Sequence, residues 1–132
     1  MFDWHPKLGL VGMLLLCCST AGAEEQHPTF QSLELPSDGL TAPSLLGLVD
    51  AFLTTREIEF AEAGISVSMP ADATAGTVMM ELRGYADDSV LGEVILLEVE
   101  RSEGGYMLLE AGGLYLCARG ENAETPQREP CP

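Results

Sequence analysis

The sequence predicts an α+β domain in which one amphipathic helix packs on a four-stranded antiparallel meander. Apolar residues before Arg56 recur with the 3.6-residue period of a helix, and after Arg56 they alternate with a period of two, as in half-buried strands. Turn signals separate the strand segments by too few residues for the crossovers that parallel strands require. These three observations favour a two-layer fold with the helix on the apolar face of the sheet.

The helix is predicted over residues 43–55. Pro43 suits the first helical turn, where a missing N–H is not needed, whereas Gly47 weakens the helix slightly. The apolar residues that share one face at helical spacing are Leu45, Leu48, Val49, Phe52 and Leu53. This face is expected to pack on the sheet.

Four strands with period-two alternation are predicted after the helix. Their alternating apolar positions are Ile65, Val67 and Met69; Val78, Met80 and Leu82; Ile95, Leu97 and Val99; and a last segment from Tyr106 to Cys117. Turns are predicted at 70–72, 84–89 and 102–105, the last because paired glycines accept positive φ. Gly112-Gly113 predicts a bulge that bends the last strand. A helix followed by a curved meander is similar to cystatin-like and NTF2-like rolls, an analogy of fold that carries no function.

Residues 1–23 are predicted to be a secretory signal peptide. The α-amino group and Lys7 give a positive start, an apolar run of about 11 residues follows, and the small residues Ala21 and Ala23 predict cleavage after Ala23. At about 1.5 Å rise per residue the run spans roughly 16 Å, about half the hydrocarbon core of a bilayer. The sequence therefore predicts a periplasmic or secreted protein with no stable membrane span after cleavage.

Two alternatives to simple cleavage stay open. A permanent membrane anchor is disfavoured because the apolar run is short and no later stretch is long enough to span a bilayer. Lipid attachment at Cys17 or Cys18 is disfavoured because Leu16, rather than a small residue, precedes Cys17.

The mature chain is small and strongly acidic. Cleavage leaves 109 of the 132 residues, which is one domain's worth. It removes Lys7 and Asp3, one of six bases and one of 21 acids, so the net charge stays at −15. Nucleic acid and anionic lipid need clustered basic residues, so no nucleic-acid partner is predicted. The acidity indicates solubility, with attraction to a cationic partner or a metal ion as the sharper alternative.

The two cysteines that remain after cleavage, Cys117 and Cys131, are predicted to form a disulfide. Export sends them to an oxidising space, and no downstream histidine completes a tetrahedral zinc site with them. The bond would close a loop of about 15 residues and contribute roughly 3 kcal/mol. It would also hold a polar, proline-rich tail that has no other reason to be ordered.

The sequence carries no constellation for nucleophilic catalysis, so a protein without enzymatic activity is predicted. His27 is the sole imidazole after cleavage, and no G-x-S-x-G motif is present. Zinc ligands, a Walker loop and G-x-G-x-x-G after a strand are also missing from the sequence, so no cofactor is predicted.

Carboxylates are the remaining candidates for a site. Asp87 and Asp88 lie in a predicted turn, and Glu98 and Glu100 share one strand face about 7 Å apart. The favoured interpretation is structural, because Asp bonds its own backbone in turns and the glutamates form a solvated strand face. The sharper alternatives are glycosidase-like acid–base work and weak calcium binding, for which Asp87 and Asp88 are the first candidates although the EF-hand spacing is absent. The basic residues expected to pair with surface acids are Arg83, Arg101 and Arg119.

Several short segments of the strand region form a distinctive pattern. They are Gly84-Tyr85-Ala86-Asp87-Asp88-Ser89-Val90, Gly104-Gly105-Tyr106-Met107-Leu108, Ala111-Gly112, and Cys117-Ala118-Arg119-Gly120 with Cys131-Pro132. The pattern resembles a group of small exported bacterial proteins over residues 57–132. This chain departs from the group at Tyr106, where tryptophan is expected, and around Glu121, where a more basic, glycine-rich stretch is expected. The resemblance implies an envelope location and the disulfide, and it supplies no activity.

The chain is thus divided into a signal peptide (1–23), a flexible N-terminal arm (24–42), an α+β domain (43–118) and a disulfide-held C-terminal tail (119–132). Within the arm, Phe30, Leu33 and Leu35 are candidates for a short edge strand. The predicted function is a non-enzymatic interaction module that binds an envelope protein or component through the concave sheet face or the closed tail. The alternative is a roll that binds a small ligand or metal through surface carboxylates, and a hydrolase comes third.

Overall fold

The computed structural model describes residues 29–132. The predicted signal peptide therefore lies outside the described residues, together with its cleavage positions Ala21 and Ala23. The candidate lipid-attachment residues Cys17 and Cys18 lie outside them as well, and so does His27, the histidine expected to remain after the predicted cleavage.

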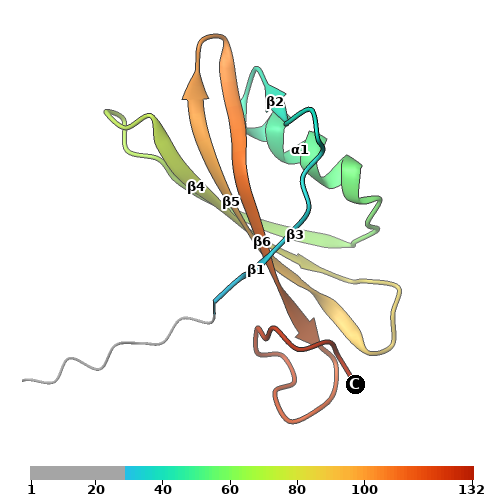
Figure 1. The fold of residues 1–132 in the computed structure, drawn as a ribbon. Helices are drawn as coiled ribbons and strands as arrows, with labels where there is room; N and C mark the ends of the chain where they lie inside the picture. The colour runs from blue at the N-terminus through green and yellow to red at the C-terminus, as the bar shows by residue number, and fades with distance from the viewer. Residues whose placement is uncertain (1–28) are drawn as a thin grey trace, which may run out of the picture.

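One helix lies against one face of a twisted antiparallel sheet (Figure 1). The elements are β1 (Gln31–Ser32), β2 (Thr41–Ala42), α1 (Leu45–Arg56), β3 (Glu62–Ser68), β4 (Ala75–Arg83), β5 (Val90–Ser102) and β6 (Gly105–Cys117). The α+β class with one helix is confirmed. The sheet has six strands rather than the predicted four, because two short strands from the N-terminal arm join it.

The sheet order is β1-β6-β5-β4-β3, with β2 also paired to β6. The four strands after the helix pair in chain order, each antiparallel to the next. The arm, predicted to be flexible, runs along the outer edge of β6, with Gln31 opposite Gly113 and Thr41 opposite Met107. Between these pairs the N–H of Leu33 donates to the carbonyl of Ala111 over 2.8 Å. Residues 29–42 are therefore held by the sheet.

Helix α1 begins at Leu45, two residues later than the sequence predicts. The reason is Ser44, whose hydroxyl accepts a hydrogen bond from the N–H of Gly47 over 3.0 Å and so caps the helix. Glu57 ends the helix in the left-handed conformation, with φ of 53°. The helix is held to the sheet by Leu48, Val49 and Phe52, which are buried.

Side chains fill the space between helix and sheet. Leu48 and Phe52 are 0% exposed, and so are the residues of β4 and β5 that face them. The core consists of Leu48, Val49, Phe52, Val78, Met80, Leu82, Ile95, Leu97, Val99, Leu108 and Ala111. A smaller cluster of Val94, Leu114 and Leu116, with Phe30 and Leu91 packed against it, lies apart from this core. The alternation predicted for β4 and β5 therefore does select the residues of the core.

The predicted bulge at Gly112-Gly113 is wrong. Pairing of β6 with β5 is continuous there, and the irregularities lie between Val90 and Gly92 and between Glu98 and Val99. The two glycines instead make room for the arm. A Cβ atom on Gly112 would lie 2.6 Å from Cβ of Phe30, and one on Gly113 would lie 3.3 Å from the Leu33 side chain.

The C-terminal tail folds back on the end of β6 (Figure 1). The predicted disulfide closes it. Cys117 and Cys131 are bonded, with their Cα atoms 5.3 Å apart. Gln127 pairs with Tyr115 through two backbone hydrogen bonds of 2.8 and 3.0 Å. The tail thus continues the cover that the arm gives to the edge of β6.

Candidate functional site

The two aspartates of the turn before β5 do not converge on a common point. Asp87 Oδ1 accepts hydrogen bonds from the Ser89 N–H (2.8 Å), the Ser89 hydroxyl (2.9 Å) and the Val90 N–H (3.3 Å). Asp88 instead lies 3.7 Å from the guanidinium of Arg119. The bonds from Ser89, its N–H first, hold the pKa of Asp87 below its usual value. Asp87 therefore shapes the turn, as the structural interpretation of the sequence has it.

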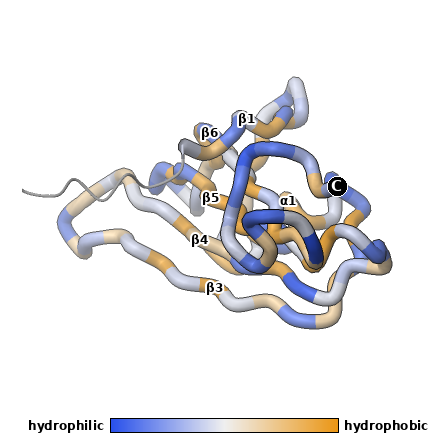
Figure 2. The backbone as a smooth tube through the Cα atoms, turned by 90° about the horizontal axis from the view of Figure 1, so that it is seen from below, coloured by the Kyte–Doolittle hydropathy of each residue, from blue (hydrophilic) through white to orange (hydrophobic). Residues whose placement is uncertain are grey.

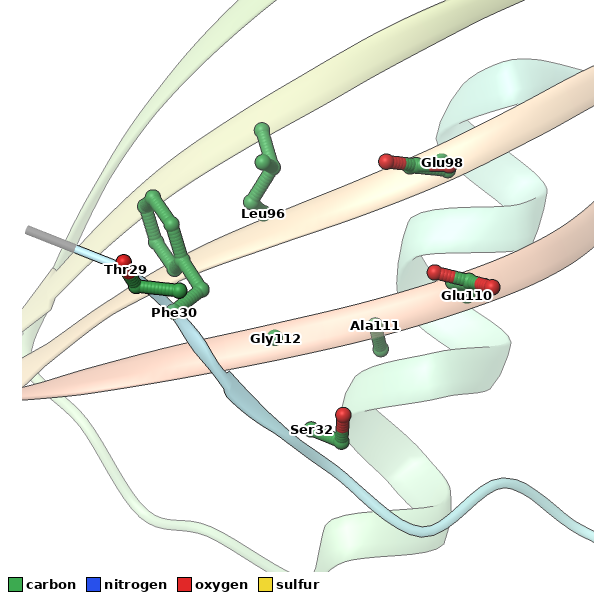
Figure 3. Close-up of a pocket in the computed structure, with 8 residues that line it drawn as sticks. All are labelled: Thr29, Phe30, Ser32, Leu96, Glu98, Glu110, Ala111 and Gly112. Atoms are coloured by element: carbon green, nitrogen blue, oxygen red, sulfur yellow. The ribbon is translucent and has the colours of Figure 1, made fainter. Parts of the chain in front are cut away.

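The acidic strand face is larger than the sequence indicates. Glu98 of β5 lies directly opposite Glu110 of β6, while Glu100 lies opposite Met107. The two opposed glutamates border a shallow surface hollow of about 200 Å³, on the side of the sheet away from α1 (Figure 3). Phe30 and Thr29 stand at the other end of this hollow in the same view. Like charges opposite each other in a sheet are mildly destabilising, and both glutamates are exposed to solvent.

The most connected polar cluster is one that the sequence does not predict. Glu93 of β5 is only 13% exposed and accepts hydrogen bonds from Arg56 (3.3 Å) and from the hydroxyl of Tyr85 (3.1 Å). Arg56, the last residue of α1, is 21% exposed and also lies with its guanidinium carbon 6.0 Å from the centre of the Phe52 ring. Glu93, Arg56 and Tyr85 therefore tie the helix, the sheet and the turn before β5 together at one end of the core.

This cluster is built for support rather than for proton transfer. Both oxygens of Glu93 are engaged, and Arg56 Nη1 is a buried donor without a hydrogen-bond partner. Burial first, and then the negative charge and hydrogen bond of Glu93, raise the pKa of Tyr85 well above its ordinary value. A phenol held so firmly in its neutral form is a poor acid or base near neutral pH.

The raised pKa of Tyr85 predicts a loss of stability in alkali. An unfolded tyrosine loses its proton near pH 10, whereas folded Tyr85 keeps it. The stabilisation is therefore complete below about pH 10 and is lost as pH rises from there toward the folded pKa. Denaturant unfolding at a series of pH values should show this decline, and tyrosinate absorbance should show a late-titrating group. The Tyr85→Phe variant should lose the late-titrating group and part of the slope, and an unchanged profile would contradict the assignment.

The far edge of the sheet is open. All seven residues of β3 are exposed, and the strand runs along the margin of the fold (Figure 2). In the part of the chain that the structure describes, β4 is its single neighbour in the sheet. Ile65 and Val67 are 43% and 54% exposed, although the sequence pattern is that of a half-buried strand. Met79 of the neighbouring strand is 44% exposed. This edge, the residues Glu62–Ser68 with Met79, is called the β3 edge below.

The arginines divide into two groups that the sequence does not distinguish. Arg83 pairs with Glu81, and Arg119 reaches Asp88 and the terminal carbonyl of Pro132, as expected of surface partners. Arg101 is different, because its guanidinium donates a hydrogen bond to the sulfur of Met69 over 3.5 Å.

Within residues 29–132, no group of three or more His, Cys, Asp or Glu side chains is placed to hold a metal ion. Across that same stretch of chain, no helix has the length and apolar character needed to cross a membrane. No family model, no curated protein and no solved structure matches this chain. Fold and site together define a small α+β domain with a filled core, a disulfide-closed tail and one uncovered sheet edge.

Proposed function

We propose that this protein is a non-enzymatic interaction module that binds another protein outside the cytoplasm. The observation that carries the proposal is the contrast between the two edges of the sheet. The arm and the tail cover the edge of β6, with pairs at Gln31, Thr41 and Gln127. Among residues 29–132, no segment covers the β3 edge in this way, and the edge presents half-exposed apolar side chains.

The filled interior supports an interaction module over a ligand-binding roll. A site for a small molecule is normally a concave cavity that encloses most of the ligand. Here Phe52 and Leu48 occupy the space between α1 and the sheet and are 0% exposed. The contact surface proposed here is the β3 edge, in place of the concave sheet face or the closed tail that the sequence suggested.

The proposed location is the periplasm or the medium, reached through the N-terminal signal peptide with cleavage after Ala23. The disulfide between Cys117 and Cys131 supports this location, because such bonds persist in oxidising compartments. The likeness to cystatin-like and NTF2-like rolls is retained only as an analogy of fold.

The interaction function can be tested by capture. The immobilised disulfide-bonded protein is exposed to proteins of the envelope and culture medium, and the same chain, reduced and unfolded, serves as the control for charge alone. We expect a partner that binds the folded protein at a fixed stoichiometry. Free protein in solution should compete with the immobilised protein for this partner. The proposal would be overturned if no protein bound the folded chain in preference to the unfolded control.

The same preparation tests the runner-up, a roll that binds metal or a small ligand through surface carboxylates. Calorimetric titration with calcium should give no binding heat if the interaction module is the correct description. Binding heat that disappears in the Asp87→Asn variant would instead favour the metal-binding alternative. We expect no calcium binding at Asp87 because its Oδ1 atom already accepts hydrogen bonds from Ser89 and Val90.

A further inference from the structure

We infer that the β3 edge binds a basic, extended segment of the partner, which adds to the sheet as a further strand. The inference rests on the proposed function and specifies its surface and the chemistry of its partner. Strand addition of this kind draws affinity from main-chain hydrogen bonds and specificity from alternating side chains.

The backbone of β3 is available for pairing. An edge strand leaves alternate N–H and C=O groups without strand partners, and proteins usually protect such strands with proline, lysine, bulges or covering segments. Residues Glu62–Ser68 contain neither proline nor lysine, and their pairing with β4 is continuous from Glu62 opposite Arg83 to Ser68 opposite Thr77. The edge of β6, by contrast, is covered by the arm and the tail.

The side chains of the β3 edge offer apolar contacts on both faces of the sheet. Ile65 and Val67 lie opposite the buried residues Met80 and Val78, so they extend the core-facing side of the sheet beyond the helix. Met79 lies opposite Ser66 and extends the other side. A strand added beside β3 would therefore place one set of alternate side chains against the half-exposed Ile65 and Val67.

Charge selects the kind of strand that can approach. Five exposed carboxylates precede, follow or adjoin β3. The five are Glu57, Glu59, Glu62, Asp72 and Glu81. Two arginines lie near them: Arg83 is paired with Glu81, and Arg101 donates to the sulfur of Met69, just beyond the end of β3. The chain as a whole carries a net charge of −15, which opposes pairing of β3 with a second copy of itself. The same field attracts a strand that carries Lys or Arg between its apolar residues.

The test uses a designed seven-residue peptide of the same length as β3, acetyl-Lys-Val-Lys-Ile-Lys-Val-Lys-amide. A peptide of identical composition without alternation, acetyl-Lys-Lys-Val-Ile-Val-Lys-Lys-amide, controls for charge alone. We expect the alternating peptide to bind more tightly and to slow hydrogen exchange at amides of residues 62–68. Added salt should weaken the binding, because the attraction between exposed charges is screened.

Two matched variants locate the binding surface. Val67→Lys places a positive charge on the edge, which repels the lysines of the alternating peptide. Binding of this peptide should weaken about tenfold. Leu46→Lys makes the same change of charge at an apolar residue of α1 that is 69% exposed, and it should leave binding nearly unchanged. Both positions are exposed, so both variants are expected to fold, and the disulfide and helix content verify this.

Three results would overturn the inference. They are equal binding of the two peptides, protection of amides elsewhere than residues 62–68, and concentration-dependent protection of β3 in the free protein, which would identify a second copy as the occupant. If capture nevertheless yields a partner whose binding survives Val67→Lys, the interaction function stands and only the β3 edge is ruled out. If capture yields no partner while the alternating peptide binds at β3, the edge is competent and the proposed function is what fails.

Discussion

Reduction of the Cys117–Cys131 disulfide is expected to lower the free energy of unfolding by about 3 kcal/mol and the melting temperature by more than about 10 °C. The bond joins residues 14 apart in sequence, so its main effect is to restrict the unfolded chain. Urea unfolding of the oxidised and reduced protein measures the difference. Because Cys117 is fully buried, its thiol must be accommodated within the fold after reduction, and the measured difference includes this local repacking.

Reduction should also act locally, at the covered edge of β6. The tail pairs with β6 through Gln127 and Tyr115, and Glu124 N–H donates to the carbonyl of Cys117 over 2.9 Å. Without the disulfide the tail has few apolar contacts to hold it in place. Amide exchange at Tyr115 should therefore accelerate, while Leu108, whose N–H donates to Leu40 in the arm, should change only with global stability.

A Cys117→Ala/Cys131→Ala double variant is the control for the chemistry of the reductant. It should resemble the reduced protein in stability and should not respond to further reductant. Equal stability of the oxidised and reduced forms, with Tyr115 protected in both, would show that the tail holds itself and that the disulfide contributes little.

Local sequence signals anticipate the elements of this fold well. Alternation places Met80 and Leu97 in the core, and the turn predicted at 102–105 forms with φ of 82° at Gly104. The capping residue Ser44 corrects the helix start by only two residues. These features depend on neighbours in the chain, and neighbours are what a sequence pattern records.

Long-range placement is what the sequence pattern could not supply. Ile65 and Val67 follow the alternation of a covered strand, yet they are half exposed. The reason is that α1 lies over β6 and β2 and does not extend over β3. Alternation defines the two faces of a strand but does not state whether anything covers either face. The proposed interaction surface consists of β3 residues that have the alternation of a buried strand but are not covered by the helix.

Gly112 and Gly113 illustrate the same limit in another way. Their lack of side chains predicts a bend in the strand, but their neighbours are Phe30 and Leu33, some 80 residues earlier in the chain. Close approach of another segment is one of the usual reasons for glycine within a strand, beside a bulge or a tight bend. Choosing between the reasons required knowledge of where the arm lies.

The sequence does not predict the cluster of Glu93, Arg56 and Tyr85, because Glu93 is a single acid in a segment otherwise rich in apolar residues. Its alternation places it on the core side, opposite Leu82, where an unpaired carboxylate would be costly. An acid at a core-facing position is a signal that a basic partner lies nearby. The sequence does not state that the partner is Arg56, 37 residues away at the end of α1.

Substitution of Glu93 by alanine is accordingly expected to cost about 3 kcal/mol of stability, toward the lower end for a broken buried pair because Arg56 and Glu93 are 21% and 13% exposed. Three effects combine: Arg56 loses its counter-charge, the hydroxyl of Tyr85 loses its acceptor, and a small void opens at the end of the core. The late titration of Tyr85 should also move toward the ordinary range, since Glu93 contributes to the raised pKa. Denaturant unfolding and tyrosinate absorbance measure the two effects on the same sample.

The double variant Arg56→Met/Glu93→Leu separates the value of the ion pair from the cost of an orphaned charge. Because no charge is left without its partner, the double variant should lose less stability than the single variants Arg56→Met and Glu93→Leu lose together. The difference, which is the coupling energy, should be about 1–3 kcal/mol. Replacement of buried ion pairs by apolar residues of similar volume is often neutral or stabilising, and this replacement would also remove the unpaired Nη1 donor of Arg56. Strict additivity of the single losses would show that Glu93 supports the fold mainly through Tyr85 and packing. In that case the contact between helix and sheet at this end of the core depends on Phe52 rather than on the charge of Arg56.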